Sequence, residues 1–181
     1  MRQKQARRRM LGCVAAVVAA TVLLASSPSG ASSPGAYGHG NLISAGALRT
    51  FSFSVTTDAD GAVKGHFNVY NRGMDVRLFV DIDCATFLPG GRAIVGGLIT
   101  RSSNPLFAVG RFSVFGVEDN GEGSNAPVDR MTTVPDYAPA LEKSCTDFFF
   151  AEDGTLRDEA NPTVILRPLN PILAGNIQVL T

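Results

Sequence analysis

The sequence predicts an all-β protein, a single antiparallel β-barrel or β-sandwich of about eight strands with little helix. Apolar and polar residues alternate with a period of two over several segments after Leu48. Turn-forming residues (Gly, Asn, Asp and Pro) interrupt these segments about every ten residues. No segment carries the apolar spacing of a helix of three turns. Together these features favour many short strands around one core.

The N-terminal segment has the order of a secretory signal peptide. Basic residues within Arg2–Arg9 precede an apolar run, Met10–Ala25, and small residues follow it. We expect cleavage after Ala31, which makes the protein secreted and extracellular. The pair Arg7-Arg8 leaves open whether export follows the general or the twin-arginine route.

The remaining chain divides into a flexible Gly/Ser-rich lead, residues 32–47, and a β domain, residues 48–181. Five of the sixteen basic residues lie in residues 1–31, so the rest carries eleven basic against sixteen acidic residues, a net charge of −5. This charge argues against binding nucleic acid or an anionic membrane through bulk electrostatics. We therefore expect a small ligand or a cell-envelope component as the partner, and no cofactor.

The clearest alternation predicts three consecutive strands. Phe51, Phe53 and Val55 alternate with serine and threonine, and the turn at residues 58–61 leads into a second strand at residues 63–70. From Met74 to Cys84 apolar residues occupy every other position, which predicts a third strand with the cysteine on its buried face.

The middle of the chain is apolar on both strand faces. Residues 93–100 and 106–117 therefore predict central strands covered on each side, with a bulge or a close backbone approach at Gly96-Gly97. Less regular elements follow: short strands at residues 131–134, 145–150, 163–167 and 176–180, and a single helical turn within residues 136–143.

An acidic loop joins the strand at residues 106–117 to the next one and is the best site candidate. Its carboxylates are Glu118, Asp119, Glu122 and Asp129. Four carboxylates could supply oxygen ligands for calcium, but their spacing matches no calcium-binding loop. We favour a solvated rim loop in which Asp129 pairs with Arg130 or Arg111, and we predict no metal.

Two aspartates on the predicted third strand raise the question of catalysis. Asp81 and Asp83 share one strand face about 7 Å apart by strand rise, together with Arg77, a separation suited to an acid/base pair. A solvated polar face explains the same pattern. Convergence of these residues or His66 in one pocket would favour an enzyme, and dispersal over a wet face would favour a binder. The sequence assigns no catalytic residue.

Cys84 and Cys145 form an even pair once the leader with Cys13 is removed. In an exported chain oxidising conditions favour a disulfide between them. Two free buried thiols or a metal pair are the alternatives.

Several segments taken in order resemble a group of exported proteins of high-GC Gram-positive bacteria of the post-COAP type. They are Phe51-Ser52-Phe53 with Gly61 to Phe67, Cys84 with Gly91-Arg92-Ala93 and Gly96 to Arg101, Val117 to Gly123 with Asp129-Arg130, and Gly175 to Val179. The resemblance implies a small β-barrel or sandwich and a Cys84–Cys145 bridge. It carries no established activity, so it assigns no catalytic residue.

The sequence thus favours a non-enzymatic binding or cell-surface module. One alternative is a small exported hydrolase or isomerase that uses carboxylates at a barrel mouth. Another is an envelope component that self-associates through the doubly apolar strands at residues 93–100 and 106–117.

Overall fold

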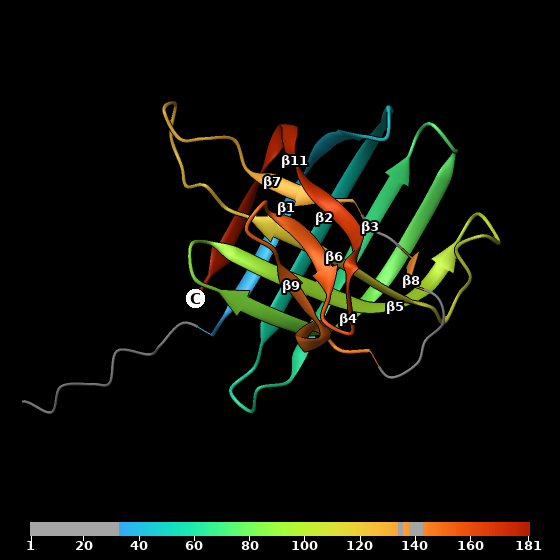
Figure 1. The fold of residues 1–181 in the computed structure, drawn as a ribbon, viewed down its shortest axis with the longest axis horizontal. Coiled ribbons are helices and arrows are strands. Elements are labelled where there is room, and N and C mark those ends of the chain that lie inside the picture. The colour runs from blue at the N-terminus through green and yellow to red at the C-terminus, as the bar shows by residue number, and fades with distance from the viewer. Residues whose placement is uncertain (1–32, 134–135, 138–142) are drawn as a thin grey trace, which may run out of the picture. The chain divides into compact units, whose positions relative to one another are not determined.

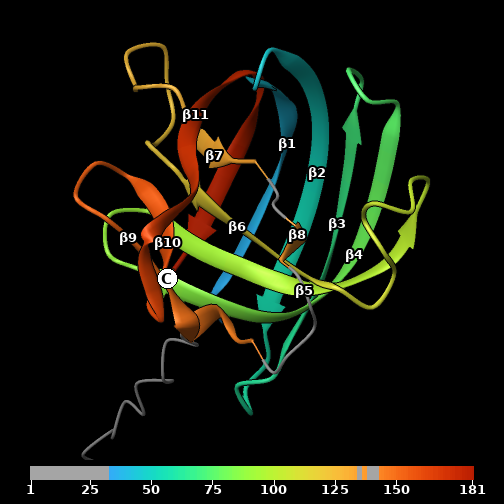
Figure 2. The same cartoon turned by 45° about the vertical axis from the view of Figure 1, so that its right-hand side comes forward.

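Eight antiparallel strands close into a β-barrel in the computed structural model, which describes residues 33–133, 136–137 and 143–181 (Figures 1 and 2). Around the barrel the order is β1 (Gly35–Ser44), β2 (Ala47–Thr57), β3 (Val63–Asn71), β4 (Val76–Leu88), β5 (Arg92–Ser102), β6 (Phe112–Glu118), β7 (Arg130–Thr132) and β11 (Asn161–Leu180). Pairing of β11 with β1 closes the sheet. The predicted all-β fold is confirmed, and the architecture is a barrel. The predicted signal peptide, residues 1–31, lies outside the described residues.

The barrel interior is filled by side chains. Because strand residues alternate between faces, the middle of each of β2, β3 and β4 buries its inward residues, such as Phe53, Phe67 and Val80, as predicted. The prediction that Cys84 lies on the inward face of β4 is wrong, because the register shift after Ile82 turns it toward the outer cluster. Phe115 of β6 lies between two inward rings, with ring centroids 4.5 Å from Phe67 and 5.4 Å from Phe53. This packing makes the interior a hydrophobic core that binds the strands together.

The prediction of a flexible lead at residues 32–47 is wrong, because Gly35–Ser44 forms β1 and pairs along its length with β2. Two of its glycines, Gly38 and Gly40, lie against aromatic rings of β2. A Cβ on Gly38 would lie 2.7 Å from Phe53 Cε1, and one on Gly40 would lie 3.2 Å from Phe51 Cζ. The absent side chains therefore leave space that aromatic rings of the neighbouring strand occupy.

Replacing Gly38 by alanine is expected to lower the free energy of unfolding by about 1–3 kcal/mol, because the added methyl overlaps the Phe53 ring. Urea unfolding of the chain from Ser32, which contains every described strand, measures the loss. Ser54→Ala changes an outward side chain on the adjacent strand and should stay within about 0.5 kcal/mol of the parent. Equal midpoints for the two variants would show that β1 has room for a side chain.

The strand predicted at residues 106–117 begins only at Phe112. Asn104 folds the preceding segment into a turn, since its Oδ1 accepts the Leu106 N–H (2.9 Å) and its carbonyl accepts the Phe107 N–H (3.0 Å). Gly110 then adopts a φ of +84°, a left-handed conformation that favours glycine. An apolar composition alone could not distinguish this loop from a strand.

The predicted double coverage is confirmed for β6 and for the first half of β5, whereas Leu98 of β5 is 39% exposed. On β5, Val95 faces the barrel core, while Ile94 faces a second apolar cluster outside the barrel. Every residue of β6 is buried. The predicted irregularity at Gly96-Gly97 is also confirmed, because the register with β4 shifts between Ile82 and Cys84 opposite these glycines.

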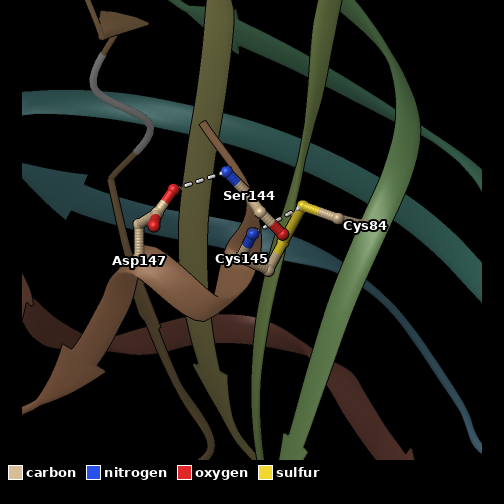
Figure 3. The surroundings of a disulfide bond; sticks show 4 residues. All are labelled: Cys84, Ser144, Cys145 and Asp147. Carbon is tan, nitrogen blue, oxygen red and sulfur yellow. Dashed lines mark hydrogen bonds between the residues drawn. A yellow bond between two sulfur atoms is a disulfide. The ribbon is translucent and has the colours of Figure 1, made fainter. Parts of the chain in front are cut away.

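A small outer layer covers this second cluster. It consists of the 3-10 turn η1 (Cys145–Asp147), β9 (Phe148–Phe150) and β10 (Thr155–Asp158). A disulfide between Cys84 of β4 and Cys145 of η1 ties the layer to the barrel, as predicted (Figure 3). Two hydrogen bonds support the turn: Cys145 N–H donates to Cys84 Sγ, and Ser144 N–H donates to Asp147 Oδ2. The segment at residues 145–150 is therefore a strand only in its second half.

The C-terminal strand is longer than predicted. Residues 163–167 and 176–180 belong to one strand, β11, which pairs first with β10 and then with β7 and β1. Pro168 and Pro171 lie at the ends of the β10 and β7 pairings, where a missing N–H costs little. Part of the predicted helical turn forms the short strand β8 (Asp136–Tyr137), and residues 138–142 lie outside the described range.

In the portion of the chain that the structure describes, no helix has the length and apolar character needed to cross a membrane.

Candidate functional site

The acidic loop between β6 and β7 is anchored to the barrel by its own carboxylates. Glu118, which is buried, accepts hydrogen bonds from Arg92 Nε (2.8 Å) and from Arg130 Nη1 (3.3 Å). Both arginines are more than a third exposed, so the ion pairs remain screened by water. Arg130 therefore pairs with Glu118, at the point where β6 ends and β7 begins.

Two further carboxylates take the place of a neighbouring strand. Beyond Pro171, β11 has no strand partner on its β7 side among the described pairings. Asp129 Oδ2 accepts the Ile177 N–H (2.8 Å), and Asp119 Oδ2 accepts the Val179 N–H (3.0 Å). The Asp129 carbonyl accepts the Ile172 N–H at 3.0 Å. These bonds give the β11 N–H groups the acceptors that a longer β7 would have supplied.

Glu122 completes the attachment at the surface. Its Oε1 accepts hydrogen bonds from Asn176 Nδ2 and Gln178 Nε2, both at 2.9 Å. These two amides, that of Gln178 most strongly, lower the pKa of the Glu122 carboxyl below its usual value. Gln178 Oε1 in turn accepts a hydrogen bond from the Tyr37 hydroxyl, which links the loop to β1.

The acidic loop is thus a structural latch along the β7–β11 seam. The prediction of a solvated rim loop is wrong for Glu118 and Asp129, because both are buried. The suggested pairing of Asp129 with Arg130 or Arg111 is replaced by backbone contacts: Asp129 Oδ1 accepts the Asn120 N–H at 3.0 Å, and Oδ2 accepts that of Ile177. Among the described residues no group of three or more His, Cys, Asp or Glu side chains is arranged to hold a metal.

The aspartates of β4 lie on the outer wall of the barrel. Asp81, Asp83, Arg77 and His66 are all exposed. The register places Ser54, His66 and Asp81 side by side on three adjacent strands, which is the residue set of a hydrolytic triad. No hydrogen bond links the three side chains in the described structure, and their position in the open ladder gives no pocket around them. Dispersal of these residues over a solvated face, rather than convergence in one pocket, favours a binding protein over an enzyme.

A groove on the same wall brings other residues together. It has a volume of about 250 Å³ and runs across β2, β3 and β4. Its outward lining comprises Thr50, Ser52, Asn68, Tyr70, Arg77 and Phe79.

Arginines stack on both aromatic rings at this groove. Arg77 Cζ lies 4.6 Å from the Tyr70 ring centroid, and Arg72 Cζ lies 5.8 Å from it. Arg101 Cζ lies 3.8 Å from the Phe79 ring centroid. Tyr70 is further held by a 2.9 Å hydrogen bond from its hydroxyl to Asp75 Oδ1. Cation–π contact of this kind attracts a guanidinium to the face of a ring. Arg72 also donates from Nη2 to Thr50 Oγ1 at 3.3 Å.

The sequence pattern singled out Arg77 only as a neighbour of Asp81 and Asp83, and it did not single out Tyr70 or Phe79. The arrangement depends on register, which sets Tyr70 opposite Arg77 and Phe79 opposite Arg101. A cross-strand pairing of aromatic and arginine residues could have been sought in the sequence, yet β4 and β5 are offset by a bulge that the alternation does not locate. Comparison with known proteins finds no match to this chain among family models, curated proteins or solved structures.

Proposed function

We propose that the protein is an exported, non-enzymatic binding module that recognises oxyanion-bearing ligands in the groove over β2, β3 and β4. The observation that carries the proposal is the set of stacked arginines beside that groove, Arg72, Arg77 and Arg101, each of them exposed. Guanidinium groups bind carboxylates and phosphates through paired N–H donors. The ligand class is a phosphate- or carboxylate-bearing small molecule or envelope saccharide.

The location of polar groups supports binding rather than catalysis. The carboxylates of the acidic loop are engaged as acceptors for arginines, amides or backbone N–H groups. The barrel interior holds a packed apolar core. A ligand would therefore meet polar side chains at the outer wall, where Ser52 and Asn68 offer a hydroxyl and an amide. The Thr50 hydroxyl beside them donates to Asn41 and accepts from Arg72.

Export is part of the proposal. Its support is the basic and then apolar order of residues 2–25 and the Cys84–Cys145 disulfide, a bond typical of oxidising compartments. The resemblance to exported post-COAP-type proteins agrees with this location. In the envelope, phosphorylated and carboxylated polymers would present ligands of the proposed class.

Binding of inorganic pyrophosphate and of a galacturonate trimer, followed by NMR titration at low salt, tests the proposal. We expect Arg77→Ala to weaken binding about tenfold or more, because one charge-assisted pair is lost. Arg77→Lys should recover only part of it, since lysine keeps the charge but not the planar fork. Lys64→Ala, which removes an exposed cation from the same sheet, is the matched control and should change affinity less than twofold.

The proposal fails if neither probe binds at millimolar concentration. It also fails if Arg77→Ala and Lys64→Ala weaken binding equally, because the arginines would then act only through net charge. Chemical-shift changes should concentrate at Ser52, Asn68 and Tyr70.

A further inference from the structure

Two neighbouring loops at one end of the barrel expose large aliphatic side chains. Leu106 is 67% exposed and Val109 62%, both in the loop before β6, and Met74 of the β3–β4 turn is 48% exposed. Hydrogen bonds join the two loops: Arg77 N–H donates to Ser103 Oγ at 2.9 Å, and Ser103 N–H donates to the Arg77 carbonyl at 3.0 Å. The loops lie side by side in both views, away from the acidic loop (Figures 1 and 2).

Contacts at both ends of the loop before β6 direct Leu106 and Val109 outward. Phe107 packs against the barrel core and is the inward residue of the loop. The Leu106 carbonyl accepts a hydrogen bond from Arg111 Nη1 (3.0 Å), and the Gly110 N–H donates to the Ile99 carbonyl (2.8 Å). The loop is therefore held by these hydrogen bonds and by Phe107, and Leu106 and Val109 remain on its outer side.

Positive charge gathers at the same end. The exposed arginines Arg72, Arg77 and Arg101 lie on or beside these loops. The half-buried Arg49 lines a small cavity with Val76 and Phe107. Desolvation, followed by repulsion from Arg167, lowers the pKa of Arg49, and its Nε has no hydrogen-bond partner. Asp75 in the β3–β4 turn accepts a hydrogen bond from Tyr70, while the ribbon of the acidic loop lies on the opposite side of the barrel (Figure 2).

We propose that this end of the barrel docks on an anionic lipid bilayer, with Leu106 and Val109 entering the boundary between head groups and acyl chains and the arginines binding lipid phosphates. Transfer of the exposed Leu106 and Val109 side chains from water to an apolar surrounding is favourable. The arginines beside them are attracted to anions at a membrane surface. An anionic bilayer offers lipid phosphates at its surface and an apolar region just below them, within reach of one inserted loop. A soluble polyanion would engage the arginines and leave the aliphatic tips in water.

The net charge of −5 does not exclude this docking, because the exposed Arg72, Arg77 and Arg101 lie on or beside the two loops. The sequence-based expectation of no membrane contact after leader cleavage treats the charge as uniform. Screening at physiological salt limits electrostatic influence to about 8 Å, so a bilayer at the loop end responds to the nearby arginines rather than to the distant latch.

Flotation with vesicles tests the proposal, using the chain from Ser32. Vesicles of phosphatidylglycerol and phosphatidylcholine (about 40:60) are compared with pure phosphatidylcholine. We expect binding to the anionic vesicles, and we expect the double variant Leu106→Ser/Val109→Ser to reduce the bound fraction about fivefold or more. The double variant Val128→Ser/Leu173→Ser removes the same two residue types, 56% and 59% exposed beside the latch, and should bind like the parent.

Equal losses for the two double variants would overturn the proposal, as would equal binding to both kinds of vesicle. Binding of dextran sulfate without binding of anionic vesicles would overturn it in favour of a soluble polyanion. Leu106→Ser/Val109→Ser leaves the groove intact, so its affinity for pyrophosphate should be unchanged. Failure of docking is thereby distinguished from failure of the proposed ligand groove.

Discussion

Replacing Cys84 and Cys145 together by alanine is expected to lower the free energy of unfolding by about 4 kcal/mol. The bridge joins residues 61 apart in sequence, and closing a loop of that length restricts the unfolded chain by about this amount in the chain-entropy model. The bridge also fastens η1, β9 and β10 over the cluster that contains Ile94 and Phe112. The outer layer should therefore loosen before the barrel does.

Urea unfolding with and without reductant measures the global loss, and hydrogen exchange locates it. Exchange should accelerate at the amides of Leu156 and Phe150, which pair β10 with β9, and much less at Phe67 in the barrel. A stability equal to that of the oxidised parent would show that packing alone holds the outer layer. Uniform acceleration through the barrel would show that the layer and the barrel unfold as one unit.

Replacing Asp129 by asparagine is expected to cost about 2–3 kcal/mol of unfolding free energy. The two carboxylate oxygens accept backbone N–H groups from Asn120 and Ile177, and the side chain is only 6% exposed. Asparagine offers one oxygen and one NH2 group, so one buried donor would face another donor. The latch should then detach from β11 near Ile177.

Asp60→Asn provides the control, because Asp60 is an exposed carboxylate in the β2–β3 turn, and this change should stay within about 0.5 kcal/mol of the parent. Hydrogen exchange at the Ile177 amide is the specific measurement, with faster exchange expected in the Asp129 variant alone. Unchanged exchange there would contradict the role of the carboxylate as a substitute for a strand. A loss in both variants would indicate a general effect of acidic charge.

The alternation of apolar and polar residues was sufficient for β2, β3 and the part of β4 that ends at Ile82. Their inward residues, such as Phe53 and Val80, are those the period of two predicted, because one face of each strand must leave water. Burial on both faces of β6 and of most of β5 could also be predicted, because both faces of each strand are apolar. These are local signals that do not depend on which strand pairs with which.

Three elements were predicted wrongly because their residue composition is misleading. β1 looks flexible because Gly38 and Gly40 contribute no side chain, yet rings from β2 fill the space they leave. The loop at residues 106–111 looks like a strand because its Leu and Val are apolar, although only Phe107 joins the core. β11 looks like two strands because proline normally interrupts pairing, whereas its prolines lie where one partner strand gives way to another.

Local residue patterns were enough to predict an all-β fold and a cysteine pair suited to bridging, because alternation and turn chemistry act over a few neighbouring residues. Closure of the sheet as a barrel, and the hydrogen bonds of Asp119 and Asp129 along its seam, became visible in the three-dimensional structure. It alone placed Tyr70, Arg77, Phe79 and Arg101 around one groove. The physical reason is register: contacts between strands far apart in sequence depend on pairing and bulges, which no local pattern encodes.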